Sequence, residues 1–232
     1  MIILSDTFGL EQTVLFLTIA VIGFIVAYLI YRKDPSYALN RSFSLAILLL
    51  GLSYVFSFFG NLYYIVFESG QIFFIRTAFF IALVSFMFFY YTSLAINKGQ
   101  NQMYSKLSML IFSCLILINF VIIYVLNGVY FEAGTQTNSV STMYFKIFNL
   151  GAIAVLYIVV YFYFFKSYFA VKDPHVKRNL LFFLIGWAIG GLGFLSIVGS
   201  DSYRILDLVG PFLIALSTVV ISRSVLSRDE TS

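Results

Sequence analysis

Residues 72–96 read IFFIRTAFFIALVSFMFFYYTSLAI, and a single charged residue, Arg76, interrupts the apolar and weakly polar side chains of this stretch. About 20 mostly apolar residues are enough for an α-helix to cross the hydrocarbon core of a bilayer. A strand of a membrane barrel would instead alternate apolar and polar residues over about ten positions. Residues 72–96 are therefore predicted to form a transmembrane helix.

The rest of the chain has the same character. Of its 232 residues, 61% are hydrophobic and 10% are charged, whereas about 25% of the residues in a soluble domain are charged. Seven stretches are long and apolar enough to span, at about 10–31, 42–67, 72–96, 106–127, 145–169, 178–198 and 204–226. The sequence predicts one all-α integral membrane domain of seven helices over residues 1–226, with a short cytoplasmic tail at 227–232.

The orientation follows from the lysine and arginine residues, which concentrate on the cytoplasmic side of membrane proteins. One side holds Arg32, Lys33, Arg41, Lys98, Lys106, Lys166, Lys172, Lys177, Arg178, Arg223 and Arg228. The other side holds only Arg76, Lys146 and Arg204. We therefore expect a multi-pass protein of the cell membrane with its N-terminus outside and its C-terminus in the cytoplasm. The first stretch lacks the basic flank of a signal peptide and is expected to be retained.

A few costly charges fall in the predicted outer half of the bundle. Arg76 and Asp207 lie about one turn into the third and seventh stretches, with Glu68 and Arg204 close to them in sequence. Charges within a membrane segment often mark a functional site. One interpretation is an Arg76–Asp207 ion pair that lines an outward-facing ligand pocket. The other is that each side chain extends to the headgroups and only orients its helix.

A second polar set lies deeper in the membrane segments. Tyr54, Ser57 and Asn61 recur on one face of the second stretch, and Asn119 and Asn149 occur in the fourth and fifth. These side chains are expected to point into the bundle, where interhelical hydrogen bonds stabilise packing. Ligand contact is the alternative role, and Asn61 is included among the candidate ligand-binding residues.

Small residues mark the sixth stretch, where GWAIGGLG places Gly186 and Gly190 four residues apart, followed by Gly193. This spacing allows the backbones of two helices to approach closely. Pro211 follows Gly210 in the seventh stretch and can kink that helix. Helix packing is the predicted role of these residues, and a flexible point in a moving helix is the alternative.

Several classes of function lack the residues that they need. With one cysteine and one histidine, Cys114 and His175, the chain has no internal disulfide and no histidine-rich metal site. The seventh stretch has no lysine to hold retinal, and the predicted membrane centre has no acidic residues for a proton relay. We expect no enzyme activity, no cofactor, no metal and no nucleic-acid partner.

Two stretches resemble the N-terminal seven-helix sensor region of certain microbial histidine kinases. They are RKDPSYALNRSFSLAILLLGLSYVFSFFG at 32–60 and KDPHVKRNLLFFLIGWAIGGLG at 172–193, in each of which a basic turn with a proline leads into a helix. The resemblance implies a bundle that receives a signal outside or within the membrane and passes it on through its last helix. Only SRDETS follows Leu226, so no kinase domain is expected here.

Three functions are consistent with these features. The first is a non-catalytic, receptor-like module that contacts membrane lipids and signals to a separate protein through the 32–41 and 172–178 loops. The second is an accessory subunit that packs against other membrane proteins and stabilises their complex. The third is a small-molecule transporter, although the two halves of the chain show no repeat. A receptor predicts a polar, outward-open cavity, whereas a subunit predicts a filled bundle with a bare apolar flank.

Overall fold

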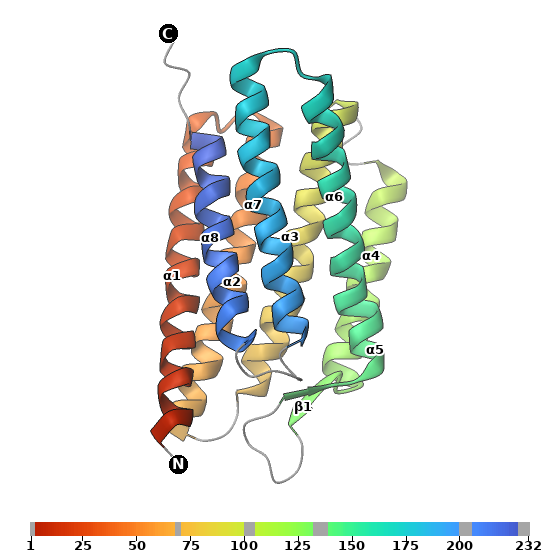
Figure 1. The fold of residues 1–232 in the computed structure, drawn as a ribbon. Helices are drawn as coiled ribbons and strands as arrows, with labels where there is room; N and C mark the ends of the chain where they lie inside the picture. The colour runs from red at the N-terminus through yellow and green to blue at the C-terminus, as the bar shows by residue number, and fades with distance from the viewer. Residues whose placement is uncertain (1–2, 68–70, 100–104, 132–138, 200–205, 227–232) are drawn as a thin grey trace.

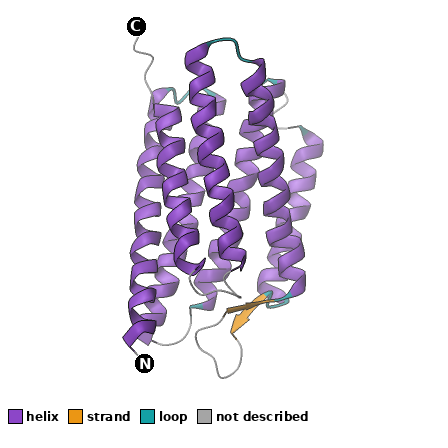
Figure 2. Cartoon of the chain, in the orientation of Figure 1, coloured by secondary structure: helices purple, strands orange, loops and turns teal. Residues whose placement is uncertain are grey.

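The computed structural model describes residues 3–67, 71–99, 105–131, 139–199 and 206–226, which form a bundle of long, nearly parallel helices (Figures 1 and 2). The helices and strands are, in chain order, α1 (Ile3–Lys33), α2 (Ala38–Phe67), α3 (Ile72–Lys98), α4 (Lys106–Phe120), the π-helical η2 (Val121–Val125), β1 (Val129–Phe131), β2 (Ser139–Ser141), α5 (Met143–Phe145), the π-helical η3 (Lys146–Leu150), α6 (Gly151–Ala170), α7 (Pro174–Gly199) and α8 (Leu206–Leu226). Because α4 continues into η2, and α5 and η3 continue into α6, these pieces form two long helices.

Six helices pack side by side around the bundle. Helix α1 lies between α8 and α2, α2 packs on α3, α3 packs on α6, and α7 lies between α6 and α8. Helix α4 lies outside this ring, against α3 and η3 (Figure 1). Aromatic side chains fill the centre: the Trp187 ring stacks on Tyr157 at a centroid distance of 4.8 Å and meets Phe89 edge-on, also at 4.8 Å. The core between α3, α6 and α7 is thus occupied by rings.

Among the described residues, six helical stretches are long and apolar enough to cross a membrane: Leu10–Lys33, Ala38–Phe67, Ile72–Lys98, Lys106–Val125, Met143–Ala170 and Pro174–Ser196. The prediction of a helical, multi-pass membrane protein is confirmed at this level. In α8 the apolar segment Val209–Ser224 is shorter. Apolar side chains such as Leu110 and Ile158 point away from the bundle, where lipid would surround them.

The chain changes direction at two ends of different charge. The basic end holds the C-terminal ends of α1, α3, α6 and α8 and the N-terminal ends of α2, α4 and α7 (Figure 1). Its basic residues are Arg32, Lys33, Arg41, Lys98, Lys106, Lys166, Lys172, Lys177, Arg178 and Arg223. The opposite, hairpin end holds β1 and β2, and the basic residues described there are Arg76 and Lys146.

The structure differs from the sequence-based expectation at several helix starts and in one connection; α1 begins at Ile3 in place of about 10, and α2 at Ala38 in place of about 42. The connection between the fourth and fifth predicted spans contains an antiparallel hairpin, in which Val129 pairs with Ser141, in place of a plain polar loop. Helix α7 begins at Pro174, four residues before the predicted start near Arg178. Proline fits the first helical position because the missing N–H would have no helical partner there. The Asp173 carboxylate accepts the His175 N–H at 2.8 Å and so caps the first turn.

Hydroxyl and amide side chains join neighbouring helices near the basic end. Ser44 donates to the Ala27 carbonyl and Ser85 to the Ala46 carbonyl, each at 2.7 Å. Asn97 donates to the Tyr163 carbonyl at 3.0 Å. These bonds link α1 with α2, α2 with α3, and α3 with α6, so polar contacts tie the helices together where the hydrophobic effect contributes little.

Glycines bring α7 and α8 into close contact. A Cβ atom at Gly193 would lie 2.8 Å from the Gly210 carbonyl oxygen, and one at Gly186 would lie 3.1 Å from the Ile221 backbone nitrogen. Gly190 faces the Ser217 side chain in the same contact, and Pro211 is buried within α8. The contact of α7 with α8 through Gly186, Gly190 and Gly193, next to Pro211, is called the glycine seam.

A similar contact joins α1 and α2, where a Cβ atom on Gly23 would lie 3.3 Å from the Gly51 Cα. Sequence reasoning overlooked this contact. The spacing of Gly23 and Ala27, four residues apart, is the signal that points to it.

The glycine seam predicts the effect of added methyl groups. Gly193→Ala is expected to lower the free energy of unfolding by about 1–3 kcal/mol, because backbone atoms of α8 cannot move aside without separating the helices. The melting temperature in detergent, followed by Trp187 fluorescence, measures this loss.

Gly151→Ala is the matched control, since its Cβ would meet only the Lys146 carbonyl, at an ordinary 3.6 Å. This change is expected to be neutral or to stabilise by up to about 1 kcal/mol, because alanine favours helix. Equal melting temperatures for the two variants would contradict close packing at the seam.

Candidate functional site

The hairpin end contains a compact structure built around the start of β1. Asn127 has a φ of 51°, a left-handed conformation that asparagine tolerates better than most residues. It turns the chain so that the Gly128 N–H donates to the Ile122 carbonyl at 2.8 Å. A side chain on Gly128 would lie 2.8 Å from that same carbonyl oxygen, so glycine is needed there. The Gly128 carbonyl in turn accepts the Thr142 N–H at 2.8 Å.

An apolar cluster holds this turn against the bundle. Val129 and Phe145 are almost completely buried together with Ile122 and Ile123. Side chains of α3 pack against the cluster, and the Phe79 ring meets the Phe145 ring edge-on at 5.1 Å. The hairpin is therefore a packed part of the bundle.

Arg76 clamps the hairpin to α3. Its Nε and Nη2 atoms both donate to the Val129 carbonyl oxygen, at 2.9 and 2.6 Å. The side chain is half-buried one turn into the helix. Hydrogen bonds that involve a charged group contribute about 1.5–3 kcal/mol. The guanidinium thus binds a backbone carbonyl from a segment that is 53 residues away in sequence.

The other predicted ligand-binding charges lie largely outside the described part of the chain. Glu68 and Arg204 fall in the segments that the structure does not describe, 68–70 and 200–205. Asp207 is a helical residue of α8, but its side chain is not described. An ion pair between Arg76 and Asp207 therefore stays a prediction.

Asn61 takes part in a different contact. Its Nδ2 donates to the Gln12 Oε1 at 3.3 Å and so joins α2 to α1. Ser57, from the same polar set, donates to the Ser53 carbonyl, and the nearby Ser53 donates to the Leu50 carbonyl, both within the same helix. Asn61 thus contacts α1, whereas Arg76 contacts the hairpin, so the two side chains belong to separate contacts.

Two asparagines are completely buried near the hairpin end, each beside a π-helical turn. Asn119 precedes η2, and Asn149 lies within η3. The Asn119 Nδ2 donates to the carbonyls of Leu115 at 3.0 Å and Phe148 at 3.4 Å, which ties α4 to η3. Its Oδ1 and both amide atoms of Asn149 have no hydrogen-bond partner among the described residues.

Such unpaired amides are expensive, because a buried polar group without a partner costs about 1–3 kcal/mol. π-Helical turns are also rare, and when they occur they are frequently found at functional sites. The hairpin, the Arg76 clamp and the two asparagines therefore form a candidate site at the corner between α3, α4 and α6. The three unpaired amide atoms are the groups left there to form hydrogen bonds with a further polar group. Among the described residues no three His, Cys, Asp or Glu side chains lie together as a metal site requires.

No protein-family model, curated protein or solved structure matches this chain. The likeness to kinase sensor regions thus depends on residues 32–60 and 172–193 alone and stays a prediction. Both stretches begin at the basic end: the first covers the α1–α2 turn and most of α2, and the second covers the α6–α7 turn and most of α7. In the α1–α2 turn, the Asp34 carboxylate accepts hydrogen bonds from the Ser36 hydroxyl and from the backbone N–H groups of Ser36 and Tyr37. These hydrogen bonds lower the pKa of the Asp34 carboxyl group.

The Arg76 clamp can be tested with two substitutions. Arg76→Gln removes both hydrogen bonds of the guanidinium, and Arg76→Lys keeps the charge but loses the planar fork that lets two N–H groups reach one oxygen. Both variants are expected to speed amide hydrogen exchange at Gly128 and Thr142 by roughly 10-fold or more, from the loss of about 1.5–3 kcal/mol. Wild-type exchange in the lysine variant would show that Arg76 serves only as a positive charge.

Replacement of the two asparagines is predicted to change stability to different extents. Asn149→Leu removes two unpaired polar atoms and is expected to raise the free energy of unfolding by about 1 kcal/mol or more. Asn119→Leu removes the bond to the Phe148 carbonyl and is expected to lower it, or to raise it less than Asn149→Leu does. Thermal melts of both variants in one detergent check the order. Destabilisation by Asn149→Leu larger than by Asn119→Leu would contradict the unpaired state of Asn149.

Proposed function

We propose that this protein is a non-catalytic, receptor-like membrane module that passes a signal from its hairpin end to a separate partner at its basic end. The observation that carries the proposal is the pair of buried, incompletely hydrogen-bonded asparagines beside two π-helical turns, directly beneath the clamped hairpin. Elsewhere the described bundle is filled mainly by aromatic and aliphatic side chains, and the Tyr157 hydroxyl is the one further buried side-chain atom without a partner among the described residues. A costly polar corner in such a bundle is a place where a second conformation or a bound polar group gains stability.

The proposal includes seven spans, with α8 as the seventh, the N-terminus outside and the C-terminus in the cytoplasm. The support is the distribution of charge, since ten of the described basic residues lie at one end of the bundle and two at the other. Cytoplasmic loops carry the excess of lysine and arginine. The hairpin and Arg76 then face the outside, and the 32–41 and 172–178 loops face the cytoplasm.

A continuous set of contacts leads from the polar corner to the basic end. The η3 turn runs into α6, whose Tyr157 and Phe164 stack on Trp187 and Phe183 of α7 at 4.8 and 4.0 Å. Helix α7 meets α8 along the glycine seam, where small residues let one helix slide on the other. In this mechanism a shift at the hairpin moves η3 and α6, and the stacked rings carry the movement to α7 and α8.

An accessory subunit of a membrane complex is the second candidate. The filled core favours it, as does α4, which lies outside the ring of helices and leaves Leu107, Leu110 and Leu117 more than 60% exposed. Lipid or a neighbouring protein would cover such a face equally well.

Removal of the hydrogen bonds between Arg76 and the Val129 carbonyl tests the proposal. This loss is expected to cause the same movement of the helices as the signal does. In a Cys114→Ser background, spin labels on Leu107→Cys and Val176→Cys report the distance between the basic ends of α4 and α7. Both positions are exposed. Arg76→Gln is expected to shift the distance distribution or to add a second population.

Thr77→Val is the matched control, because it removes a different hydrogen bond at the neighbouring residue, the 2.9 Å contact between the Thr77 and Tyr124 hydroxyls. Its distance distribution is expected to equal that of the parent protein. An unchanged distribution in Arg76→Gln would count against signalling. Purification from the native membrane as a stoichiometric complex with enzymatic subunits would favour the accessory role instead.

A further inference from the structure

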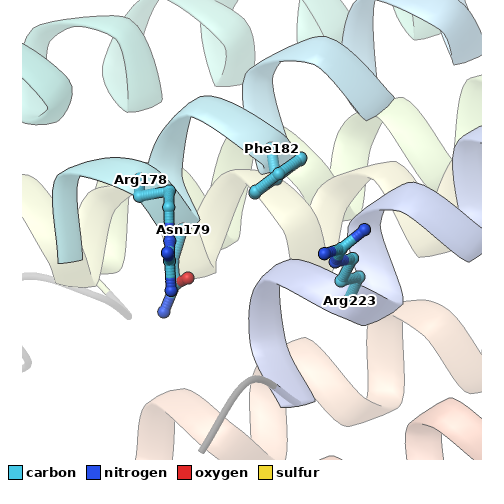
Figure 3. A pocket seen from close by; sticks show the side chains of 4 residues that line it. All are labelled: Arg178, Asn179, Phe182 and Arg223. Carbon is cyan, nitrogen blue, oxygen red and sulfur yellow. The ribbon is translucent and has the colours of Figure 1, made fainter. Parts of the chain in front are cut away.

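A small hollow opens between α7 and α8 at the basic end of the bundle. Its volume is about 180 Å³, and it is lined by Arg178, Asn179 and Phe182 of α7 and by Arg223 of α8 (Figure 3). Arg178 and Phe182 are four residues apart and so share one face of the helix. The site thus combines two guanidinium groups, one amide and one aromatic ring from two different helices.

The two arginines have no acidic partner among the described residues. Asp173, the acidic residue closest to Arg178 in sequence, accepts the N–H groups of His175 and Val176 at 2.8 and 3.4 Å. The Arg223 guanidinium lies over the Phe182 ring, 5.1 Å from its centroid, and this cation–π contact holds the group at the wall of the hollow. The N–H donors at the edge of that guanidinium remain available to an anion.

The chemistry and size of the hollow indicate the class of its ligand. Arginine forks match the oxygens of phosphate or carboxylate groups, and an asparagine amide adds a further donor. A volume of about 180 Å³ is smaller than the roughly 300–1,000 Å³ of pockets for drug-sized ligands, so it suits a single charged group. Arg178 lies four residues after the start of α7, and Arg223 three residues before the end of α8. At about 1.5 Å per residue, both lie within roughly 6 Å of a helix end, at the level of the headgroups.

We propose that this hollow binds the phosphate of an anionic phospholipid headgroup. Basic pockets between membrane helices on the cytoplasmic side bind such headgroups, and each arginine near the surface adds about 1 kcal/mol of attraction. The bound phosphate bridges α7 and α8 just beyond the glycine seam, where Gly186 already meets the Ile221 backbone. The lipid thereby bridges the two helices that meet along the glycine seam. This site does not depend on signalling, but it rests on the orientation proposed above, which places the basic end in the cytoplasm.

The test uses the single tryptophan of the chain, Trp187, which lies nine residues after Arg178 on the same helix. The full-length protein is reconstituted in phosphatidylcholine vesicles with a trace of phosphatidylglycerol or phosphatidylcholine, each carrying a dansyl acceptor near the headgroup. Energy transfer from Trp187 is expected to be larger to the anionic lipid. Arg178→Gln together with Arg223→Gln is expected to weaken that preference roughly 30-fold, about fivefold for each arginine.

Lys98→Gln together with Lys106→Gln is the matched control, since it removes two exposed positive charges from the same end on other helices. The control is expected to keep the preference, and circular dichroism verifies that both double variants are helical. Equal transfer to the two lipids in the wild type, or equal losses in the two double variants, would overturn the site.

Glycerol phosphate added to the vesicles distinguishes the two sources of a phosphate group. Persistence of the preference at millimolar glycerol phosphate supports a lipid-held phosphate, which the acyl chains keep at the membrane surface. Loss of the preference at that concentration would overturn the lipid assignment and identify the hollow as a site for soluble phosphate esters.

Discussion

Inside hydrocarbon, every backbone N–H and C=O group needs a partner within the protein, and the rest of this structure depends on that constraint. It explains why the apolar stretches form helices. It also explains why backbone groups at the hairpin end, where the chain is no longer helical, form hydrogen bonds within the protein. There the Gly128 N–H, the Val129 carbonyl and the Thr142 N–H all find partners, and one of those partners is a charged side chain, Arg76. The side-chain amides of Asn119 and Asn149 stand out because they are also buried, and three of their four polar atoms lack a partner among the described residues.

The forces between the helices are of a different kind. Lipid chains are as apolar as leucine, so burial of apolar side chains in a membrane contributes little to helix association. Close backbone approach and hydrogen bonds replace it. Close backbone approach occurs at the glycine seam and at the Gly23–Gly51 contact. Hydrogen bonds to the carbonyls of neighbouring helices come from Ser44, Ser85 and Asn97. Stacked rings around Trp187 fill the space that remains.

These two kinds of contact are distributed unevenly. Hydrogen bonds of hydroxyl and amide side chains join α1, α2, α3 and α6, whereas α7 and α8 meet through glycines. Helix α4 packs on α3 through Tyr90, Tyr91 and Phe112 and otherwise faces outward. The proposed mechanism places movement along the seam, where glycines form the contact, and at the π-helical turns. The arginine pair at the end of the seam would let the lipid headgroup control how firmly α7 and α8 hold together.

The sequence by itself determined the helical, multi-pass character of the protein and the separation of basic residues between its two ends. Hydrophobic length and charge act through the local solvent, lipid or water, so a single stretch such as residues 72–96 carries the information. Only the tertiary structure decided that Arg76 binds the Val129 carbonyl, that Asn61 contacts Gln12, and that Arg178 and Arg223 share a hollow. Those contacts join residues distant in sequence, and their partners depend on which helices are neighbours, a property that no single stretch contains.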